Sequence, residues 1–200
     1  MRVGVLASGA GTNLQALLDT VHGREAQIVA VASDKPGAQA LQRAQAAGVP
    51  TRVFPRDKYA DRAARDAAIA DWLEESAVEL VVLAGYMAIL SASFIARFPD
   101  RILNVHPSLL PAFAGIGSVQ QALDYGVKVF GVTVHLVDDG VDTGSVVLQD
   151  ALVLPDAREA GEVLAALRPL EHALLPRAVA LVAAGRVRRD PAHPRRILTS

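Results

Sequence analysis

Apolar residues along the chain gather into short runs, and several of these runs contain no polar residue. Strands covered by helices on both faces of a sheet show this pattern, whereas strands with one exposed face alternate apolar and polar residues. Six runs are candidate strands, at positions 3–7, 28–32, 78–84, 102–105, 127–137 and 144–154, and several of them are continuously apolar.

Alanine-rich segments with helical spacing separate these runs. They predict helices over residues 12–22, 38–47, 57–75, 91–98, 117–125 and about 158–184. Alternation of strands and helices is typical of a mostly parallel sheet with helices on both sides, so the predicted class is α/β with a Rossmann-like twisted sheet. Only the turn-rich residues 138–144 separate the last two runs, which predicts an antiparallel addition in the C-terminal half.

The pattern predicts a single domain over residues 1–187, with one half at 1–100 and the other at 101–187. We find no internal repeat and no linker long enough to separate two domains. Residues 186–200 carry five arginines and two prolines. Such a segment is typical of a solvated, partly disordered end, so we expect residues 188–200 to form a tail.

Composition narrows the class of protein. The chain has 200 residues, a formal net charge of −1 and no cysteine. A charge near zero argues against nucleic acid or an anionic membrane as partner. Without cysteine there is no disulfide, no thiolate nucleophile and no cysteine-bound metal. No apolar run approaches the roughly 20 residues of a membrane span, and the first residues lack the apolar core of a signal peptide, so we expect a cytoplasmic protein.

The first strand is followed by Ser-Gly-Ala-Gly-Thr-Asn at 8–13, just before a helix. Glycines let backbone N–H groups approach an anion, and the helix N-terminus adds partial positive charge. Thr12 and Asn13 are candidates to cap that helix and to donate to a phosphate. The alternative is an ordinary strand-to-helix turn.

A dinucleotide-binding turn is the main rival for this segment. It requires a third glycine where this chain has Leu14, although Asp34 could imitate the acid that binds the ribose. A P-loop is excluded because no Gly-Lys-Ser/Thr follows.

A second candidate site lies at Asn104 and His106. The two residues project from the same face of the predicted strand, and Pro107 ends that strand at the carboxyl edge of the sheet, where open α/β sheets bind ligands. An amide beside an imidazole suits stabilisation of an oxyanion and proton transfer near neutral pH. A core histidine with an ordinary hydrogen bond is the alternative.

The loop at 138–144 is rich in carboxylates and glycine, and it is either a solvated turn or part of this site. A carboxylate near His106 would favour and orient the imidazolium. Hard-cation sites need more regularly spaced oxygen ligands, so we expect no metal. His135 lies within a strand and could face either way, whereas His172 fits an orienting or structural residue.

Five segments together resemble the phosphoribosylglycinamide formyltransferase family, a folate-dependent branch of the formyltransferases, in register from residue 1 to about 187. They are SGAGTNLQALLD at the start, VVLAGYMAILS at 81–91, NVHPSLLPAF at 104–113, GVTVHLVDDGVDTGSVVLQ at 131–149 and LEHALLP at 170–176. The Asn-x-His-Pro-Ser-Leu-Leu-Pro motif followed by Asp-x-Gly is specific to the wider superfamily. The glycine-rich start narrows the resemblance to the glycinamide ribonucleotide branch.

The resemblance implies that the substrate amine attacks the formyl carbon of 10-formyltetrahydrofolate, giving formylglycinamide ribonucleotide and tetrahydrofolate in purine biosynthesis. Asn104 and His106 match the oxyanion-stabilising pair, and Asp142 matches the aspartate that works with the histidine. Residues 1–100 become the phosphate-binding half and residues 101–187 the catalytic and folate-binding half. Both partners are small molecules, and the chain fits a monomer or a homodimer.

The same resemblance implies two sets of binding residues. Those matching the glycinamide ribonucleotide site are Gly11, Thr12, Asn13, Met87, Pro107, Arg168 and Glu171, of which the first three form the phosphate loop and Glu171 holds the ribose. Those matching the folate site are Arg62, Met87, Ala88, Ile89, Leu90, Asn104, Asp138, Asp139, Gly140, Val141 and Asp142.

Two departures from the family pattern stand out. Many members carry an arginine where this chain has Ala88, and the segment at 112–119 differs from the usual sequence after Leu-Leu-Pro. Sister enzymes remain alternatives, because formyltetrahydrofolate hydrolase shares the core and methionyl-tRNA formyltransferase shares the central motif. We expect the chain length to leave no room for the extra domains of those enzymes. A nicotinamide-dependent oxidoreductase is the more remote alternative.

Overall fold

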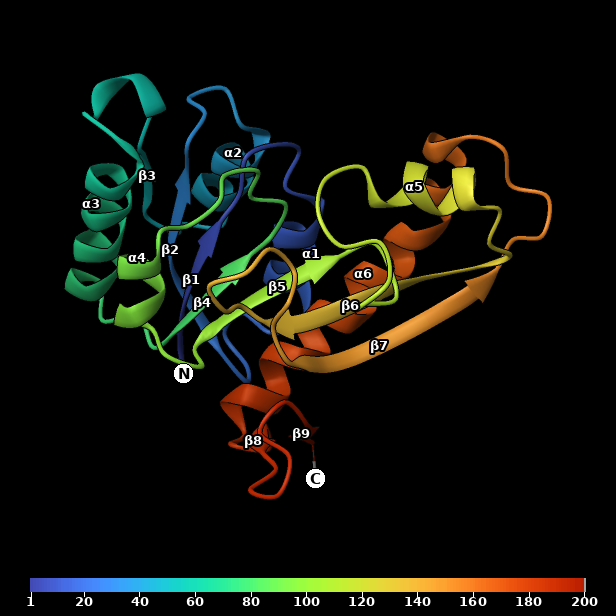
Figure 1. Cartoon of the computed structure of the whole chain (residues 1–200). Helices are drawn as coiled ribbons and strands as arrows, with labels where there is room; N and C mark the ends of the chain where they lie inside the picture. Colours follow the sequence, from blue (N-terminus) through green and yellow to red (C-terminus); the bar gives the residue numbers. More distant parts are fainter. Residues whose placement is uncertain (200) are drawn as a thin grey trace. The chain divides into compact units, whose positions relative to one another are not determined.

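The computed structural model describes residues 1–199, and the chain divides into two compact units, one from Met1 to Asn104 and one from Val105 onward. The first unit is built on parallel strands in the order β3-β2-β1-β4-β5 (Figure 1). The strands are β1 (Arg2–Leu6), β2 (Gln27–Ser33), β3 (Thr51–Val53), β4 (Leu80–Leu83) and β5 (Ile102–His106).

Helices cover both faces of these strands, with α1 packed beside α2 on one face and α3 beside α4 on the other (Figure 1). The chain steps outward from β1 to β3 and then returns to β4 on the other side of β1. Since parallel crossovers are right-handed, this reversal moves the helices to the opposite face. The helices are α1 (Thr12–Thr20), α2 (Gln39–Ala46), α3 (Arg62–Glu75) and α4 (Ala92–Arg97), with a 3-10 turn η1 at Arg56–Lys58.

The reversal places a topological switch point between β1 and β4. These two strands pair directly, with Leu6 opposite Leu83 at their carboxyl ends. The loops that leave the two strands diverge from this point, and open α/β sheets bind ligands in the resulting crevice. Both the glycine-rich turn at 8–13 and the segment at 85–91 start here.

The second unit holds the antiparallel pair β6 (Val129–Leu136) and β7 (Val146–Val153). The 24-residue helix α6 (Ala160–Ala183) packs against both strands, and α5 (Ser118–Tyr125) packs against α6. Apolar side chains such as Val132, Val134, Leu167 and Leu175 are fully buried here. A short pair, β8 (Arg188–Arg189) and β9 (Ile197–Leu198), follows α6.

The predicted fold class is confirmed, and three local predictions differ from the structure. Strand β3 was not predicted, because its three residues are not buried and form no apolar run. The predicted helix at 57–75 breaks into η1 and α3, since Asp61 caps α3 by accepting the Ala64 N–H at 2.8 Å. The tail, expected to be partly disordered, forms the β8–β9 pair. No helix in the described part of the chain is long and apolar enough to cross a bilayer.

Candidate active site

The glycine-rich turn of the first unit depends on Gly11. This residue is the N-cap of α1 in the left-handed region, at φ 69°. A Cβ at this position would lie 2.6 Å from the Cα of Ala40 in α2, so both the backbone conformation and the close helix packing require glycine. Capping by the side chain of Thr12 or Asn13 was a wrong prediction, because α1 begins at Thr12 and has no side-chain cap.

The turn presents a helix N-terminus beside open space. The opening N–H groups of a helix have no acceptor within the helix and carry partial positive charge, which favours an anion. A cavity of about 530 Å³ adjoins the turn. Its lining is Ser8, Gly9, Ala10, Lys35, Gly37, Ala38 and Gln39. Lys35 supplies its one basic side chain, so the turn and the cavity both suit a negatively charged group.

Asp34 does not fill the role that the dinucleotide interpretation required. Its carboxylate is buried and accepts the Ser8 hydroxyl at 2.6 Å and the Arg56 Nε at 3.1 Å. A carboxylate held in this way is not presented to a ribose. Leu14, where a third glycine was needed, is fully buried. Both observations count against a nicotinamide cofactor.

Ser8 and Arg56 also hold the first part of the segment at 85–91, where the resemblance placed folate contacts. The Met87 N–H donates to the Ser8 hydroxyl at 2.9 Å, and the Ser8 N–H donates to the Gly85 carbonyl at 3.1 Å. The Arg56 guanidinium donates to the Met87 carbonyl at 3.4 Å. The glycine-rich turn and the 85–91 segment are therefore joined directly.

Helix α3 holds the other end of that segment. The Ser91 N–H donates to Asp66 Oδ2 at 2.7 Å, while the buried guanidinium of Arg65 donates to Asp66 Oδ1 through Nε at 3.1 Å and Nη2 at 2.7 Å. Arg62 lies one turn before Asp66, on the same face of α3. The only sign of this contact in the sequence is an arginine–aspartate pair at adjacent positions of a helix, and the contact was not predicted.

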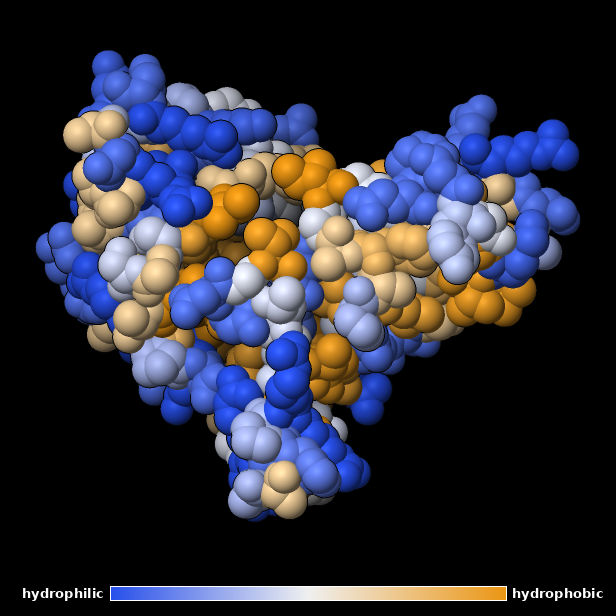
Figure 2. Space-filling view, viewed as in Figure 1, coloured by the Kyte–Doolittle hydropathy of each residue, from blue (hydrophilic) through white to orange (hydrophobic). Residues whose placement is uncertain are grey.

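Apolar side chains of the segment remain exposed although its backbone is fixed. Met87 is 70% exposed and Ile89 is 56% exposed, whereas Leu90 is buried and Ala88 is intermediate. Figure 2 shows apolar side chains among the hydrophilic ones on one face of the molecule. Large exposed apolar side chains on a fixed backbone are typical of a surface that binds a flat organic ring.

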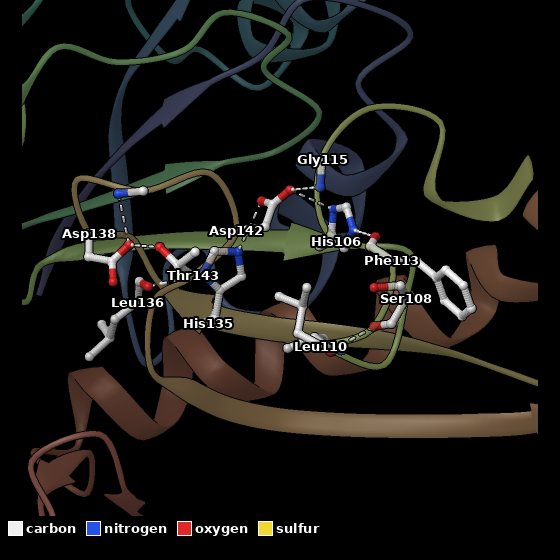
Figure 3. Close-up of polar contacts among 12 residues, drawn as sticks. His106, Ser108, Leu110, Phe113, Gly115, His135, Leu136, Asp138, Asp142 and Thr143 are labelled. Atoms are coloured by element: carbon white, nitrogen blue, oxygen red, sulfur yellow. Dashed lines mark hydrogen bonds and ion pairs between the residues drawn. The ribbon is translucent and has the colours of Figure 1, made fainter. Parts of the chain in front are cut away.

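In the second unit, both ring nitrogens of His106 face oxygen acceptors (Figure 3). Nδ1 lies 3.3 Å from Oδ2 of Asp142, and Nε2 lies 3.0 Å from the Phe113 carbonyl oxygen. An imidazolium, which donates from both nitrogens, satisfies this arrangement. His106 is 6% exposed, so its ring has little contact with solvent and its polar partners are these two oxygens.

Asp142 is the centre of the cluster (Figure 3). Its Oδ2 also accepts the Gly115 N–H at 2.9 Å, and its backbone is left-handed at φ 54°. A hydrogen bond from His135 is the largest cause that lowers the pKa of Asp142, while partial burial opposes this and the charge of His106 adds to it. The carboxylate is therefore ionised at neutral pH.

His135, whose direction the sequence pattern did not decide, belongs to this cluster. Its Nε2 lies 3.5 Å from Asp142 Oδ1, and its Nδ1 lies 3.0 Å from the Leu136 carbonyl oxygen. A β-bulge between Val134 and His135 interrupts the strict alternation of β6. Because a bulge redirects side chains, periodicity alone could not assign the direction of His135.

The segment after His106 is tied to the β6–β7 pair. Thr133 Oγ1 donates to the Ser108 carbonyl at 2.7 Å and accepts the Leu110 N–H at 3.1 Å. Gln149 donates to the same hydroxyl and to the Leu110 carbonyl, each at 2.9 Å. These bonds fix the course of the segment that carries the Phe113 carbonyl.

The remaining predicted residues fall in both units. Asn104 and His106 lie two apart on β5, as expected for one face of a strand. Pro107 directly follows this strand, and Arg168 and Glu171 lie on α6.

The loop before Asp142 contains Asp138, Asp139, Gly140 and Val141. Within this loop, Asp138 Oδ1 accepts the Gly140 N–H at 3.2 Å and the Thr143 hydroxyl at 2.5 Å. Val141 is 49% exposed.

The sequence and the fold of the chain are similar to those of known proteins. The family model described as formyl transferase matches residues 1–179. Phosphoribosylglycinamide formyltransferase of Haemophilus influenzae is 41% identical over 189 residues, covering 94% of this chain and 89% of the relative. The chain belongs to the formyl transferase family. The crystal structure of glycinamide ribonucleotide transformylase 1 from Symbiobacterium toebii has a TM-score of 0.94 and 42% identity to this formyl transferase, covering 100% of this chain and 93% of that one.

Longer relatives contain the same region. The trifunctional purine biosynthetic protein adenosine-3 of Bos taurus is 44% identical over 189 residues, which cover 94% of this formyl transferase chain and 19% of the bovine protein. The chain thus spans about a fifth of the length of that relative. Among residues 1–199, no group of three or more histidine, aspartate or glutamate side chains is placed to hold a metal ion.

Proposed function

We propose that the chain transfers the formyl group of 10-formyltetrahydrofolate to the amine of glycinamide ribonucleotide, in the cytoplasm and in purine biosynthesis. The observation that carries the proposal is the 3.3 Å approach of His106 Nδ1 to Asp142 Oδ2, because these are the histidine and aspartate of the family motif. The relatives named phosphoribosylglycinamide formyltransferase support the choice of substrate.

In this proposal the amine attacks the formyl carbon, and the carbonyl oxygen becomes an oxyanion in a tetrahedral intermediate. The amide of Asn104 and the imidazolium of His106 stabilise that oxyanion. Asp142 orients the ring through Nδ1 and places a negative charge beside it. When the intermediate collapses, the nitrogen of the folate leaves and the proton lost by the amine is transferred to it.

The substrate phosphate binds at the turn formed by Gly11, Thr12 and Asn13, where the α1 N-terminus offers N–H groups. Arg168 and Glu171 on α6 complete the substrate set, with Glu171 on the ribose, alongside Met87 and Pro107. Holding both reactants in register supplies a large part of such catalysis.

The folate donor binds through the exposed apolar side chains of Met87 and Ile89 with their neighbours Ala88 and Leu90. Arg62, Asn104 and the loop at 138–142 complete the donor set. The fixed backbone at 85–91 supports this role, because a rigid surface loses little entropy when it binds a flat ring. Ala88 leaves the donor without the arginine that many relatives carry.

The test is a spectrophotometric formyl-transfer assay with mass spectrometry of the nucleotide product. We expect wild-type activity that requires glycinamide ribonucleotide, and a loss of at least a hundredfold in His106→Ala and Asp142→Ala. His22→Asn, two residues after the end of α1, serves as the control and keeps wild-type activity. Formate release without the amine substrate would instead favour a formyltetrahydrofolate hydrolase, and inactive wild type or fully active variants would refute the proposal.

A further inference from the structure

The C-terminal segment at 186–199 forms a hairpin that is held together by its own contacts. Strand β8 pairs with β9, with Arg188 opposite Leu198 and Arg189 opposite Ile197. The Asp190 N–H donates to the Arg196 carbonyl at 2.9 Å. The hairpin follows α6 in the second unit (Figure 1) and lies outside the residues that match the family model.

Two arginines of this hairpin reach the loop that follows Asp142. The guanidinium of Arg195 donates to the carbonyl of Thr143, the residue next to Asp142. The guanidinium of Arg189 donates to the Ser145 hydroxyl at 3.0 Å and to the Pro194 carbonyl within the hairpin at 2.7 Å. Arg189 therefore bridges the hairpin and the loop, and β9 also packs against β7.

The loop that receives these contacts is unusually constrained. Asp142 holds a left-handed backbone at φ 54°, a conformation that residues other than glycine, asparagine and aspartate rarely adopt. A Cβ at Gly144 would lie 1.6 Å from the Leu136 carbonyl oxygen, so the chain passes β6 too closely for any side chain. Such a conformation persists only when surrounding contacts determine it.

We propose that the C-terminal hairpin is a positioning element for the catalytic carboxylate, acting through Arg195 and Arg189 on the backbone and side chain of residues 143–145. This inference rests on the proposed function, in which Asp142 orients His106. Arg195 is a positioning residue, since it contacts the loop and not the reacting atoms. The two arginines bind the loop to the hairpin. Strand β6 also binds the loop, because the Leu136 N–H donates to the Ser145 carbonyl at 2.9 Å.

The test compares Arg195→Ala with Arg188→Ala. Arg188 carries the same charge in the same hairpin, but its side chain makes no hydrogen bond or ion pair with another described residue. For Arg195→Ala we expect a five- to tenfold fall in kcat, the effect of losing one hydrogen bond, with an unchanged KM for glycinamide ribonucleotide. Arg195→Lys, which keeps one donor, restores part of the rate. Arg188→Ala keeps the wild-type kcat.

Hydrogen exchange provides a readout that does not depend on activity. We expect the amides at 142–147 to exchange faster in Arg195→Ala than in Arg188→Ala, with the thermal midpoints of both variants within a few degrees of wild type. Equal exchange and equal kcat in the two variants would overturn the inference. So would a fall in kcat that only follows a lower thermal midpoint, with no local change in exchange. Failure of the proposed function is distinguishable, because wild type would then transfer no formyl group while the exchange difference remained.

Discussion

The Nε2 atom of His135 lies 3.5 Å from Oδ1 of Asp142, on the carboxylate oxygen that does not face His106. Asp142 thus separates two imidazoles, each of which has its other ring nitrogen on a backbone carbonyl. One carboxylate between two rings gives His135 an indirect influence on His106. The hydrogen bond from His135 is also the largest cause that lowers the pKa of Asp142.

Replacement of His135 by leucine should therefore raise the pKa of Asp142. With the pKa raised, the carboxylate takes up a proton at a higher pH and stops supporting the His106 imidazolium there. We expect the acid limb of the pH–kcat profile to move to higher pH, measured with saturating substrates. His135→Gln, which keeps an amide donor, should shift the limb less. An acid limb that stays in place in the leucine variant would contradict this role of His135.

Asp142→Asn should change how stability depends on pH. The folded-state pKa of Asp142 lies below its ordinary value of 3.8, so the ionised group stabilises the fold at pH values above 3.8. That contribution is lost as the pH falls through the lower, folded-state pKa. Urea unfolding should show a gap between wild type and variant at pH 7 that narrows as the pH falls below 3.8. A gap that stays the same over this range would show that packing, rather than charge, carries the difference.

Gly11→Ala should destabilise the first unit strongly. The added Cβ meets the α2 backbone at 2.6 Å, and the φ of 69° disfavours any side chain. Together these effects suggest a loss of about 2–4 kcal/mol in the free energy of unfolding. Gly9→Ala is the matched control, because a Cβ there meets nothing within 4 Å. Chemical denaturation of the two variants measures the difference, and similar losses in both would contradict this account of the turn.

Elements could be predicted from the sequence where burial produces a long apolar run. They could not be predicted where the element is short or depends on contacts between residues far apart in the chain. Strands such as β4, buried along their whole length, read as continuous apolar runs. β3 has three residues and no such run. The hairpin at 186–199 is rich in arginine, a composition that predicts a solvated tail. Its order depends on carbonyl acceptors at Pro194 and Thr143, which composition does not reveal.

The candidate site divides in the same way. The local spacing of Asn104 and His106, and the glycine requirement at 11, could be predicted because each depends on neighbours in sequence. The contact of Asp142 with His135 could not, because it needs both a left-handed residue and a bulged strand. The bonds from Met87 to Ser8 and from Ser91 to Asp66 join residues far apart in the chain, and no pattern within one element indicates them.

Asp66→Ala should affect both stability and the binding of the formyl donor. Arg65 is 3% exposed, and the variant leaves its guanidinium without the carboxylate partner. Breaking a buried ion pair in this way lowers the free energy of unfolding by about 3–5 kcal/mol. It also frees the Ser91 N–H that fixes one end of the 85–91 segment. We expect KM for 10-formyltetrahydrofolate to rise severalfold, while KM for glycinamide ribonucleotide changes little because the turn at 8–13 keeps its contacts.

The control for this prediction is Asp71→Ala on the same helix. The Asp71 side chain is 64% exposed and pairs with Arg97 at 2.8 Å on the surface, where ion pairs contribute little to stability. Denaturation and steady-state kinetics on both variants separate the two positions. If Asp66→Ala lost stability but left both KM values unchanged, Asp66 would support the fold alone. A selective rise in the donor KM would instead place the buried Arg65–Asp66 pair among the groups that shape the donor surface.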